Sequence, residues 1–488
     1  MTRTQERIFL FAFLAIPLFA ILGVRIPFWG DEAGTWEIIT LPWSEFWKFF
    51  VAGEPHPPLY FALLKLWSGI FGTSERALRL PSVLLYPAMV FLTWKLSEQL
   101  RLKRNARIFA TGLAALHPSL WICARMARYY IPPAVLVLSA TCLLLYSLRK
   151  GGWRWVFYGI SMALIFWTDF PAYLTVPMHF AVILWKDRKS LLSWSISLIA
   201  AALTAIPALG FLAGSAVSYA EDSAPTPIYV AISLAYPIYT FLIGEVRYPW
   251  QVLTNLGLIG VALLFIRGII NRTRLSLILA VGPIIAGLLI LAIFFQEVPF
   301  TYYPGRLAFL FPGLMIAVAA GVEKMNRVAI FPTALLILAG YLWGINGALA
   351  GEDYINRVYD MPWVEITEEL EGMGVRSGIS RDWGAVHYMD RRMEGILLRD
   401  ALEAELPGGR VAHVWRSGAF KLLELDSLVQ RRLISERGEP IREIKMEPED
   451  PTVLKLKENL LGAEFPRYII KIYVFEKKEE PHVPGISG

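Results

Sequence analysis

Cysteine is nearly absent from this 488-residue chain, and charged side chains are scarce. The two cysteines, Cys123 and Cys142, lie within apolar runs and have the spacing of neither a disulfide framework nor a zinc site. We expect both to be packing residues. Only 18% of the residues are charged, whereas 56% are hydrophobic and the mean hydropathy is +0.48. This composition excludes an ordinary soluble globule and predicts an integral membrane protein.

Apolar runs long enough to cross a bilayer recur along the first 345 residues. A transmembrane helix needs about 20 mostly apolar residues, so we predict about eleven spans. They lie near residues 8–24, 81–98, 108–124, 131–147, 155–168, 171–185, 190–212, 250–266, 275–295, 306–322 and 328–345. We interpret the first as an uncleaved span, because its apolar core is long and no clear cleavage site precedes Phe28.

Basic residues concentrate in six hydrophilic breaks, at every second gap between apolar runs. These breaks contain only three acidic residues, Glu6, Asp187 and Glu323. Their basic residues are Arg3 and Arg7; Arg101, Lys103, Arg104 and Arg107; Arg149, Lys150 and Arg154; Lys186, Arg188 and Lys189; Arg267, Arg272 and Arg274; and Lys324 and Arg327. Cytoplasmic loops of membrane proteins hold an excess of Lys and Arg, so the N-terminus is predicted inside and the C-terminal tail outside. The net charge of +6 then reflects membrane orientation and not nucleic-acid binding.

The outer loop at residues 25–80 is too polar to span and rich in aromatic residues, which favour the membrane boundary. We expect short surface helices at 33–40, 43–52 and 58–71. If 58–71 crossed the membrane, every later basic break would change sides.

The predicted domains are therefore a transmembrane domain at 1–345 and an extracytoplasmic domain at 346–488. The tail is charged and mixed in pattern, with helices expected at 361–374 and 421–434 and strands at 410–415 and 468–475. Its length suits one small α/β domain. Because it contains no metal-ligand spacing, glycine-rich phosphate loop or nucleophile elbow, we do not expect it to carry the chemistry.

Two adjacent carboxylates, Asp31 and Glu32, follow the first span on the outer side. Asp31 could serve as the N-cap of a helix that starts near Ala33, with Glu32 favourable at its positive end. Alternatively, one carboxylate is a general base held where a lipid-linked substrate arrives. The two roles are compatible, because one carboxylate can cap the helix while the other acts as the base.

Basic and aromatic side chains on the same side are the candidates for binding an anion. His56 precedes Pro57-Pro58 at a helix start, where an imidazole can donate to a phosphate. Arg125, Arg128 and Arg306 could instead extend from helix ends to the interface between membrane and water. Outer gaps are otherwise poor in arginine, however, and a guanidinium binds phosphate through two parallel hydrogen bonds. The candidate phosphate and lipid ligands are His56, Arg125, Arg128, Tyr129, Tyr302 and Arg306.

Several of these motifs, taken in order, resemble the GT-C glycosyltransferases, and within them the protein O-mannosyltransferase and aminoarabinose-transferase group. The motifs are Trp29-Gly30-Asp31-Glu32-Ala33, His56-Pro57-Pro58-Leu59-Tyr60, residues 71–82, Ala127-Arg128-Tyr129-Tyr130 and the Tyr-Pro-x-Arg at 303–306. The resemblance implies an α-helical polytopic membrane protein that transfers a sugar from a polyprenyl phosphate to an acceptor hydroxyl outside the membrane. It also implies that Asp31 is the base and that His56 and Arg128 hold the lipid phosphate.

The chain departs from this pattern in two places. It has His56 where aminoarabinose transferases have lysine, and it lacks the Asp-x-Asp of metal-dependent oligosaccharyltransferases. We therefore expect no cofactor, and nothing in the sequence indicates a divalent metal. The expected partners are a lipid-linked sugar donor, a protein, glycolipid or glycan acceptor, and the bilayer. The alternatives are a transporter or flippase that moves the lipid-linked sugar without chemistry, and a catalytically silent scaffold.

Overall fold

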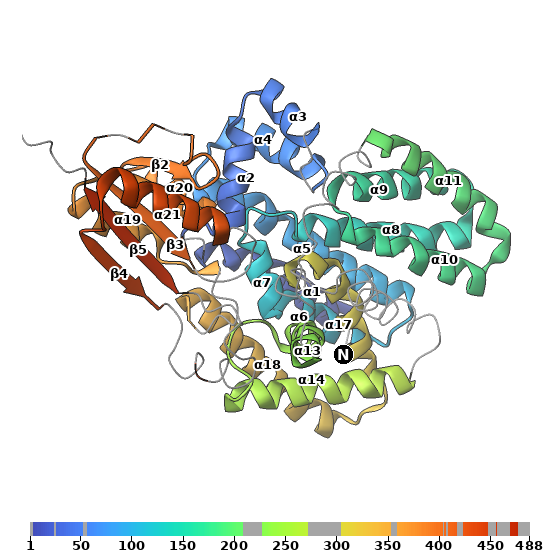
Figure 1. Cartoon of the computed structure of the whole chain (residues 1–488). Helices are drawn as coiled ribbons and strands as arrows, with labels where there is room; N and C mark the ends of the chain where they lie inside the picture. The colour runs from blue at the N-terminus through green and yellow to red at the C-terminus, as the bar shows by residue number, and fades with distance from the viewer. Residues whose placement is uncertain are drawn as a thin grey trace, which may run out of the picture. The chain divides into compact units, whose positions relative to one another are not determined.

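The chain forms two compact units in a computed structural model (Figure 1). The structure describes residues 3–23, 26–51, 56–207, 227–271, 304–352, 359–403, 405–406, 408–416, 423–447, 455 and 469–476. Unit 1 comprises residues 1–26 and 35–356, and unit 2 comprises residues 27–34 and 357–488. Unit 2 is therefore discontinuous in sequence, because a short segment of the predicted outer loop belongs to it.

Unit 1 is built from helices. Its long helices are α1 (Arg3–Ala15), which continues as the 3-10 helix η1 (Ile16–Gly23), α5 (Glu75–Gln99), α6 (Arg104–Leu116), α8 (Ile131–Lys150), α9 (Arg154–Thr168), α10 (Thr175–Lys186), α11 (Leu191–Thr204), α13 (Pro227–Ile243), α14 (Val252–Asn271), α17 (Phe311–Ala320) and α18 (Arg327–Ala350). Its remaining helical elements are α3 (Trp43–Val51), α4 (Leu59–Phe71), α7 (Pro118–Ala124), η2 (Pro171–Leu174), η3 (Arg188–Ser190), η5 (Pro304–Leu310) and η6 (Gly321–Lys324). The helix α2 (Gly30–Thr40) begins in unit 2 and ends in unit 1.

Six helical stretches of the described residues are long and apolar enough to cross a membrane, namely Thr4–Leu22, Glu75–Gln99, Ile131–Lys150, Val252–Asn271, Gly305–Lys324 and Val328–Ala350. The total of eleven spans stays a prediction, and the span expected at 275–295 lies outside the described residues. The apolar run expected to span at 108–124 is divided between two helices, because α6 ends at Leu116 and α7 begins at Pro118. A proline disfavours helical geometry in the preceding residue, and His117 is extended (φ −68°, ψ 122°).

The three helices expected at 33–40, 43–52 and 58–71 are present as α2, α3 and α4, and their position on the outer membrane surface stays a prediction. At 13 residues, α4 is about 20 Å long, well short of a bilayer core of about 30 Å. Lys65 of α4 donates to the carbonyl groups of Ile39 and Leu41, just where α2 ends. A cation on the last carbonyls of a helix satisfies acceptors that would otherwise lack partners, so Lys65 fixes α4 against the end of α2.

Ion pairs connect several of the basic breaks within unit 1. Glu6 forms ion pairs with Arg107, at an N···O distance of 2.7 Å, and with Arg104, at 3.1 Å. The main-chain nitrogen of Lys103 donates to Glu323 Oε1 at 2.7 Å. The breaks near the N-terminus, at 101–107 and at 324–327 therefore lie together, as a common side of the membrane requires.

Two further basic breaks lie close to this group. Burial first, and then the positive charges of Arg149 and Arg101, lower the pKa of Lys186. Such an effect requires the three cations to be near one another, because screened charges interact only over roughly 10 Å. The ends of α8 and α10 therefore lie on the side of unit 1 that carries the break at 101–107.

Thiol labelling should reveal which side these breaks occupy. In intact cells, an impermeant thiol reagent should label Ser435→Cys in the tail and leave Lys189→Cys unlabelled. Both positions are exposed, and the native Cys123 and Cys142 are buried, so the background should be low. After permeabilisation both variants should react. Labelling at position 189 in intact cells would reverse the predicted orientation.

Unit 2 contains a five-stranded mixed sheet in the order β2-β1-β3-β5-β4, which confirms the small C-terminal α/β domain (Figure 1). Its strands are β1 (Val375–Ser380), β2 (Glu394–Leu397), β3 (Arg410–Arg416), β4 (Arg442–Met446) and β5 (Ile470–Glu476), and its helices are α19 (Trp363–Gly372), α20 (Trp383–Met389) and α21 (Leu423–Arg437). Strands β1, β2 and β3 are parallel, and β5 is antiparallel to both β3 and β4. Parallel neighbours require a crossover connection, and α20 lies in the one between β1 and β2.

Candidate functional site

The carboxylates Asp31 and Glu32 lie in the first turn of α2. The main-chain nitrogens of Glu32 and Ala33 both donate to the carbonyl of Trp29, at 2.9 and 3.0 Å. The helix therefore begins at Gly30, and the interpretation of Asp31 as the N-cap of a helix that starts near Ala33 is wrong. Both carboxylates lie in the first turn of the helix, at the positive end of its dipole. Glu32 is 1% exposed and Asp31 is half-buried, so Asp31 is the more accessible of the two.

The segment that carries these carboxylates packs within unit 2. Phe28 and Trp29 are buried, and the Trp29 ring meets the Tyr359 ring edge-on, with centroids 5.0 Å apart. The Phe28 ring lies 5.4 Å from the ring of His387 in α20. The turn that carries Asp31 therefore packs against residues of the tail domain.

Basic and aromatic side chains of unit 1 form a second group, which we call the basic cluster: His56, Arg128, Tyr129, Asp169 and Arg306. The hydroxyl of Tyr129 lies 3.1 Å from Nδ1 of His56, and the Arg128 guanidinium lies 4.9 Å from the centre of the Tyr129 ring. Arg128 also donates to the Thr35 hydroxyl of α2 at 3.1 Å. His56, Arg128 and Tyr129, each proposed from sequence as a phosphate ligand, thus lie together.

Arg306 joins this group from a distant part of the chain. A side chain at Gly305 would lie 2.8 Å from the Tyr130 ring, so glycine allows η5 to approach the turn at 129–130 closely. Burial, and then the positive charges of Arg128 and Arg306, lower the pKa of the half-buried His56 well below its usual value. His56 is therefore neutral at pH 7, and its imidazole can donate one hydrogen bond to an anion.

Asp169 is the acidic member of the basic cluster. Burial raises its pKa well above the usual value, against the opposing effects of Arg306, of a hydrogen bond from the Ala172 amide and of Arg128. Asp169 lies between α9 and η2 and accepts this hydrogen bond from the Ala172 amide, as a turn residue does. Its position beside two arginines was not predicted, because it depends on η5, more than 130 residues further along the chain.

The remaining predicted ligands lie elsewhere or outside the described residues. Arg125 is buried and donates to the carbonyl of Ala348 at 2.9 Å, in the last turn of α18. That bond stabilises the end of a helix, and a role for Arg125 at the phosphate stays a prediction. Tyr302 lies outside the described residues.

Two further charged residues, Glu245 and Arg247, were not among the site residues predicted from the sequence. Glu245 accepts from the Tyr236 hydroxyl at 3.2 Å, and burial raises its pKa to about 8. Arg247 has a left-handed backbone (φ 75°), lies 4.0 Å from the Trp343 ring and donates to Asn346 at 3.2 Å. Residues 244–249 show no helical or strand periodicity that could have located either of them.

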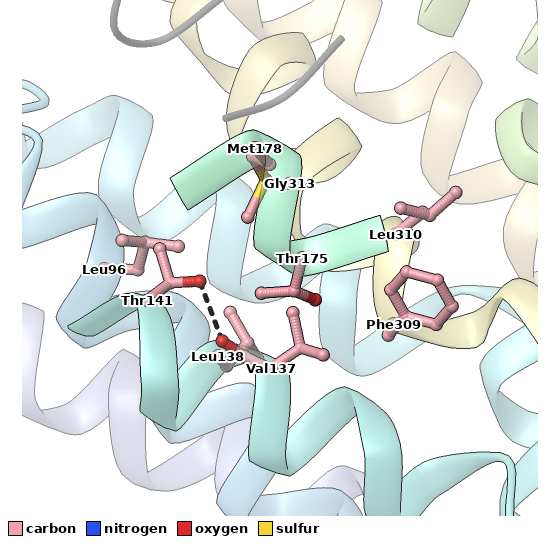
Figure 2. Close-up of a pocket in the computed structure, with 9 residues that line it drawn as sticks. All are labelled: Leu96, Val137, Leu138, Thr141, Thr175, Met178, Phe309, Leu310 and Gly313. Atoms are coloured by element: carbon pink, nitrogen blue, oxygen red, sulfur yellow. Dashed lines mark hydrogen bonds between the residues drawn. The ribbon is translucent and has the colours of Figure 1, made fainter. Parts of the chain in front are cut away.

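Metal ligands and cavities add little to this site. Among the described residues, no group of three His, Cys, Asp or Glu side chains could hold a metal ion. Figure 2 shows a small cavity in unit 1 lined mainly by apolar side chains, with two hydroxyls, Thr141 and Thr175. The Thr141 hydroxyl donates to the Val137 carbonyl at 2.7 Å. A lining without charged side chains does not suit a phosphate.

Comparison with known proteins supports the resemblance found in the sequence. The family model described as dolichyl-phosphate-mannose-protein mannosyltransferase matches residues 55–213, a segment that contains His56 and Arg128 and begins after Asp31. None of the curated proteins compared with the chain matches it.

The solved structures report on the fold. ArnT from Cupriavidus metallidurans bound to undecaprenyl phosphate has 13% identity and a TM-score of 0.55, with 97% of this chain and 98% of that chain covered. Its apo form has 12% identity and a TM-score of 0.56, over the same shares of the two chains. The oligosaccharyltransferase from Archaeoglobus fulgidus, tethered with an acceptor peptide, has 14% identity and a TM-score of 0.48, over 81% of this chain and 64% of that chain.

At these identities the likeness to ArnT establishes a fold and not a function. Together with the apolar helices, it makes the chain a multi-pass membrane protein. The chain has the GT-C glycosyltransferase fold, and over residues 55–213 it resembles the protein mannosyltransferases.

Proposed function

We propose that this protein is an inverting glycosyltransferase that moves a sugar from a polyprenyl-phosphate carrier to an acceptor hydroxyl on the outer face of the membrane. The observation that carries the proposal is the basic cluster, in which His56, Arg128 and Arg306 come from three distant parts of the chain. The guanidinium groups of Arg128 and Arg306 bring positive charge beside the neutral imidazole of His56, and an anion can bind to all three. The ligand of the mannosyltransferase family, a dolichyl phosphate sugar, supplies such an anion.

The proposed reaction is a single displacement. The oxygen of the acceptor hydroxyl attacks the anomeric carbon while its proton passes to the Asp31 carboxylate. The bond between that carbon and the phosphate oxygen breaks, and polyprenyl phosphate leaves with the bonding electrons. His56, Arg128 and Arg306 stabilise the charge that develops on the leaving phosphate. One displacement inverts the configuration at the sugar. Glu32 supports the base, and the reaction requires no cofactor.

The decisive experiment separates transfer from transport. The purified protein is reconstituted into liposomes with polyprenyl-phosphate mannose, the donor that the family description suggests, and then with other polyprenyl-phosphate sugars. Protein, glycolipid and glycan acceptors are supplied in turn. Release of free polyprenyl phosphate together with a glycosylated acceptor supports the transferase. Movement of intact donor between leaflets without release supports a flippase instead.

Donor binding should depend on pH through His56. In the free protein its pKa lies well below 6.5, and a bound phosphate raises that pKa because it offsets the charges of Arg128 and Arg306. Binding therefore takes up a proton between the two pKa values, and affinity should rise as pH falls, by at most about tenfold per pH unit. The measurement is the Kd of a polyprenyl-phosphate sugar between pH 8 and 5.5, because its phosphodiester does not titrate in that range.

The matched control is Asp169→Asn, since Asp169 is the other titratable group beside the two arginines. Asn retains the oxygen that accepts from Ala172 but does not ionise. His56→Gln should remove the dependence on pH, and Asp169→Asn should leave most of it. If the dependence survives in His56→Gln and disappears in Asp169→Asn, the carboxyl group and not the imidazole is coupled to binding.

A further inference from the structure

A hydrogen bond within unit 2 holds the segment just before Asp31. The main-chain nitrogen of Phe28 donates to the Tyr388 hydroxyl at 2.7 Å. Both residues are buried, and 360 positions separate them in the sequence. Tyr388 belongs to α20, the crossover helix between two parallel strands, so its hydroxyl is carried by a well-packed part of the tail domain.

The surroundings of Tyr388 fix the direction of its ring. The Arg391 guanidinium lies 4.6 Å from the centre of the Tyr388 ring and donates to Nε2 of His387 at 2.9 Å. The His387 ring in turn contacts the Phe28 ring. Two neighbouring residues of α20 thus contact Phe28: Tyr388 accepts from its backbone amide, and His387 packs against its ring.

A second contact lies two residues further along, at the start of α2. A side chain at Gly30 would lie 3.2 Å from Oδ1 of Asp382, so the backbone of the turn comes close to that carboxylate. Asp382 is itself fixed, because it accepts from the Gly384 amide at 2.9 Å and from Arg416 at 2.9 Å. The tail domain therefore meets the turn at residues 28 and 30, immediately before Asp31.

We propose that Tyr388 is a positioning residue for the transfer reaction, and that it acts by holding the turn that carries Asp31. The inference rests on the proposed role of Asp31 as the base. Without the Tyr388 hydroxyl, the Phe28 amide would be a buried donor with no acceptor at that point, and the turn would shift to satisfy it. A general base displaced by about 1 Å can lose on the order of a hundredfold in rate. The tail domain then contributes to catalysis without touching the substrate.

The first test is Tyr388→Phe, which removes the acceptor and keeps the ring. With polyprenyl-phosphate mannose, or the sugar donor that the protein turns over, kcat should fall about ten- to a hundredfold while the donor KM stays unchanged. Hydrogen exchange of the peptide covering residues 27–34 should become faster. The matched control is Tyr473→Phe, in β5 of the same domain, which should retain wild-type kcat and wild-type exchange at 27–34. Unchanged exchange in Tyr388→Phe would overturn the proposal whatever the activity.

The second test combines Tyr388→Phe with Asp31→Asn. If Tyr388 acts through Asp31, the tyrosine substitution should have little further effect once the carboxylate is lost. Two independent losses that multiply would overturn the positioning role. If Asp31→Asn alone keeps the wild-type rate, the proposed base fails, whereas a large loss in Asp31→Asn with a wild-type rate in Tyr388→Phe defeats only the present inference.

Discussion

Asp31→Asn is expected to reduce sugar transfer by about a hundred- to ten-thousandfold, the usual contribution of a general base. Asn has nearly the size of Asp and suits the first turn of α2, but it does not accept a proton at neutral pH. Donor binding and thermal unfolding should change little, because Asp31 is half-buried and lies in a different unit from the basic cluster. The measurement is kcat with the purified variant, alongside the Kd of the donor.

Glu32→Gln provides the matched control, since it removes the adjacent carboxylate. We expect a smaller loss of rate, because Glu32 is the supporting and less accessible of the two groups. If the glutamine variant loses more activity than Asp31→Asn, Glu32 is the base. If the asparagine variant transfers sugar at the wild-type rate, the reaction does not use Asp31 as its base.

Arg128→Ala should weaken donor binding by roughly ten- to a hundredfold, equivalent to about 1.5–3 kcal/mol for a lost hydrogen bond to a charged group. The guanidinium lies beside His56 and Tyr129 and is 4% exposed, so its removal also leaves space in the cluster. Arg128→Lys should restore part of the affinity, because lysine retains the charge but not the planar pair of donors. The measurement is donor Kd together with the thermal unfolding midpoint.

A suitable control for Arg128→Ala is Arg188→Ala, an exposed arginine in a predicted cytoplasmic break. It removes the same charge from the chain at a distance from the cluster. Equal losses of affinity in the two variants would point to a general effect of charge. Wild-type donor affinity in Arg128→Ala would assign Arg128 a structural role, such as its hydrogen bond to Thr35 and its contact with Tyr129.

Local patterns in the sequence predicted the elements that form from neighbouring residues. The helices of the outer loop were predicted from their aromatic composition, and the helices α19 and α21 and the strands β3 and β5 from local residue patterns. The strands β1, β2 and β4 and the helix α20 were missed. They are short, and β1 contains two serines and a glycine that weaken its strand character.

The site was predictable in composition but not in arrangement. Motif order selected Asp31, His56, Arg128 and Arg306, but the packing of residues 27–34 with the tail depends on contacts across more than 350 positions. The same holds for Asp169, whose local role as a turn residue was apparent while its arginine neighbours were not. Long-range proximity of this kind leaves no period in a single sequence.

The ion pairs of Glu6 constrain the order in which the protein can assemble during synthesis. Glu6 leaves the ribosome about a hundred residues before its partners Arg104 and Arg107. Lys103 is synthesised 220 residues before its own partner, Glu323. Chains are made from the N-terminus, so α1 enters the bilayer before its charge partners exist. This end of the helix bundle is therefore completed in two steps, first when α6 has been made and finally when η6 has been made.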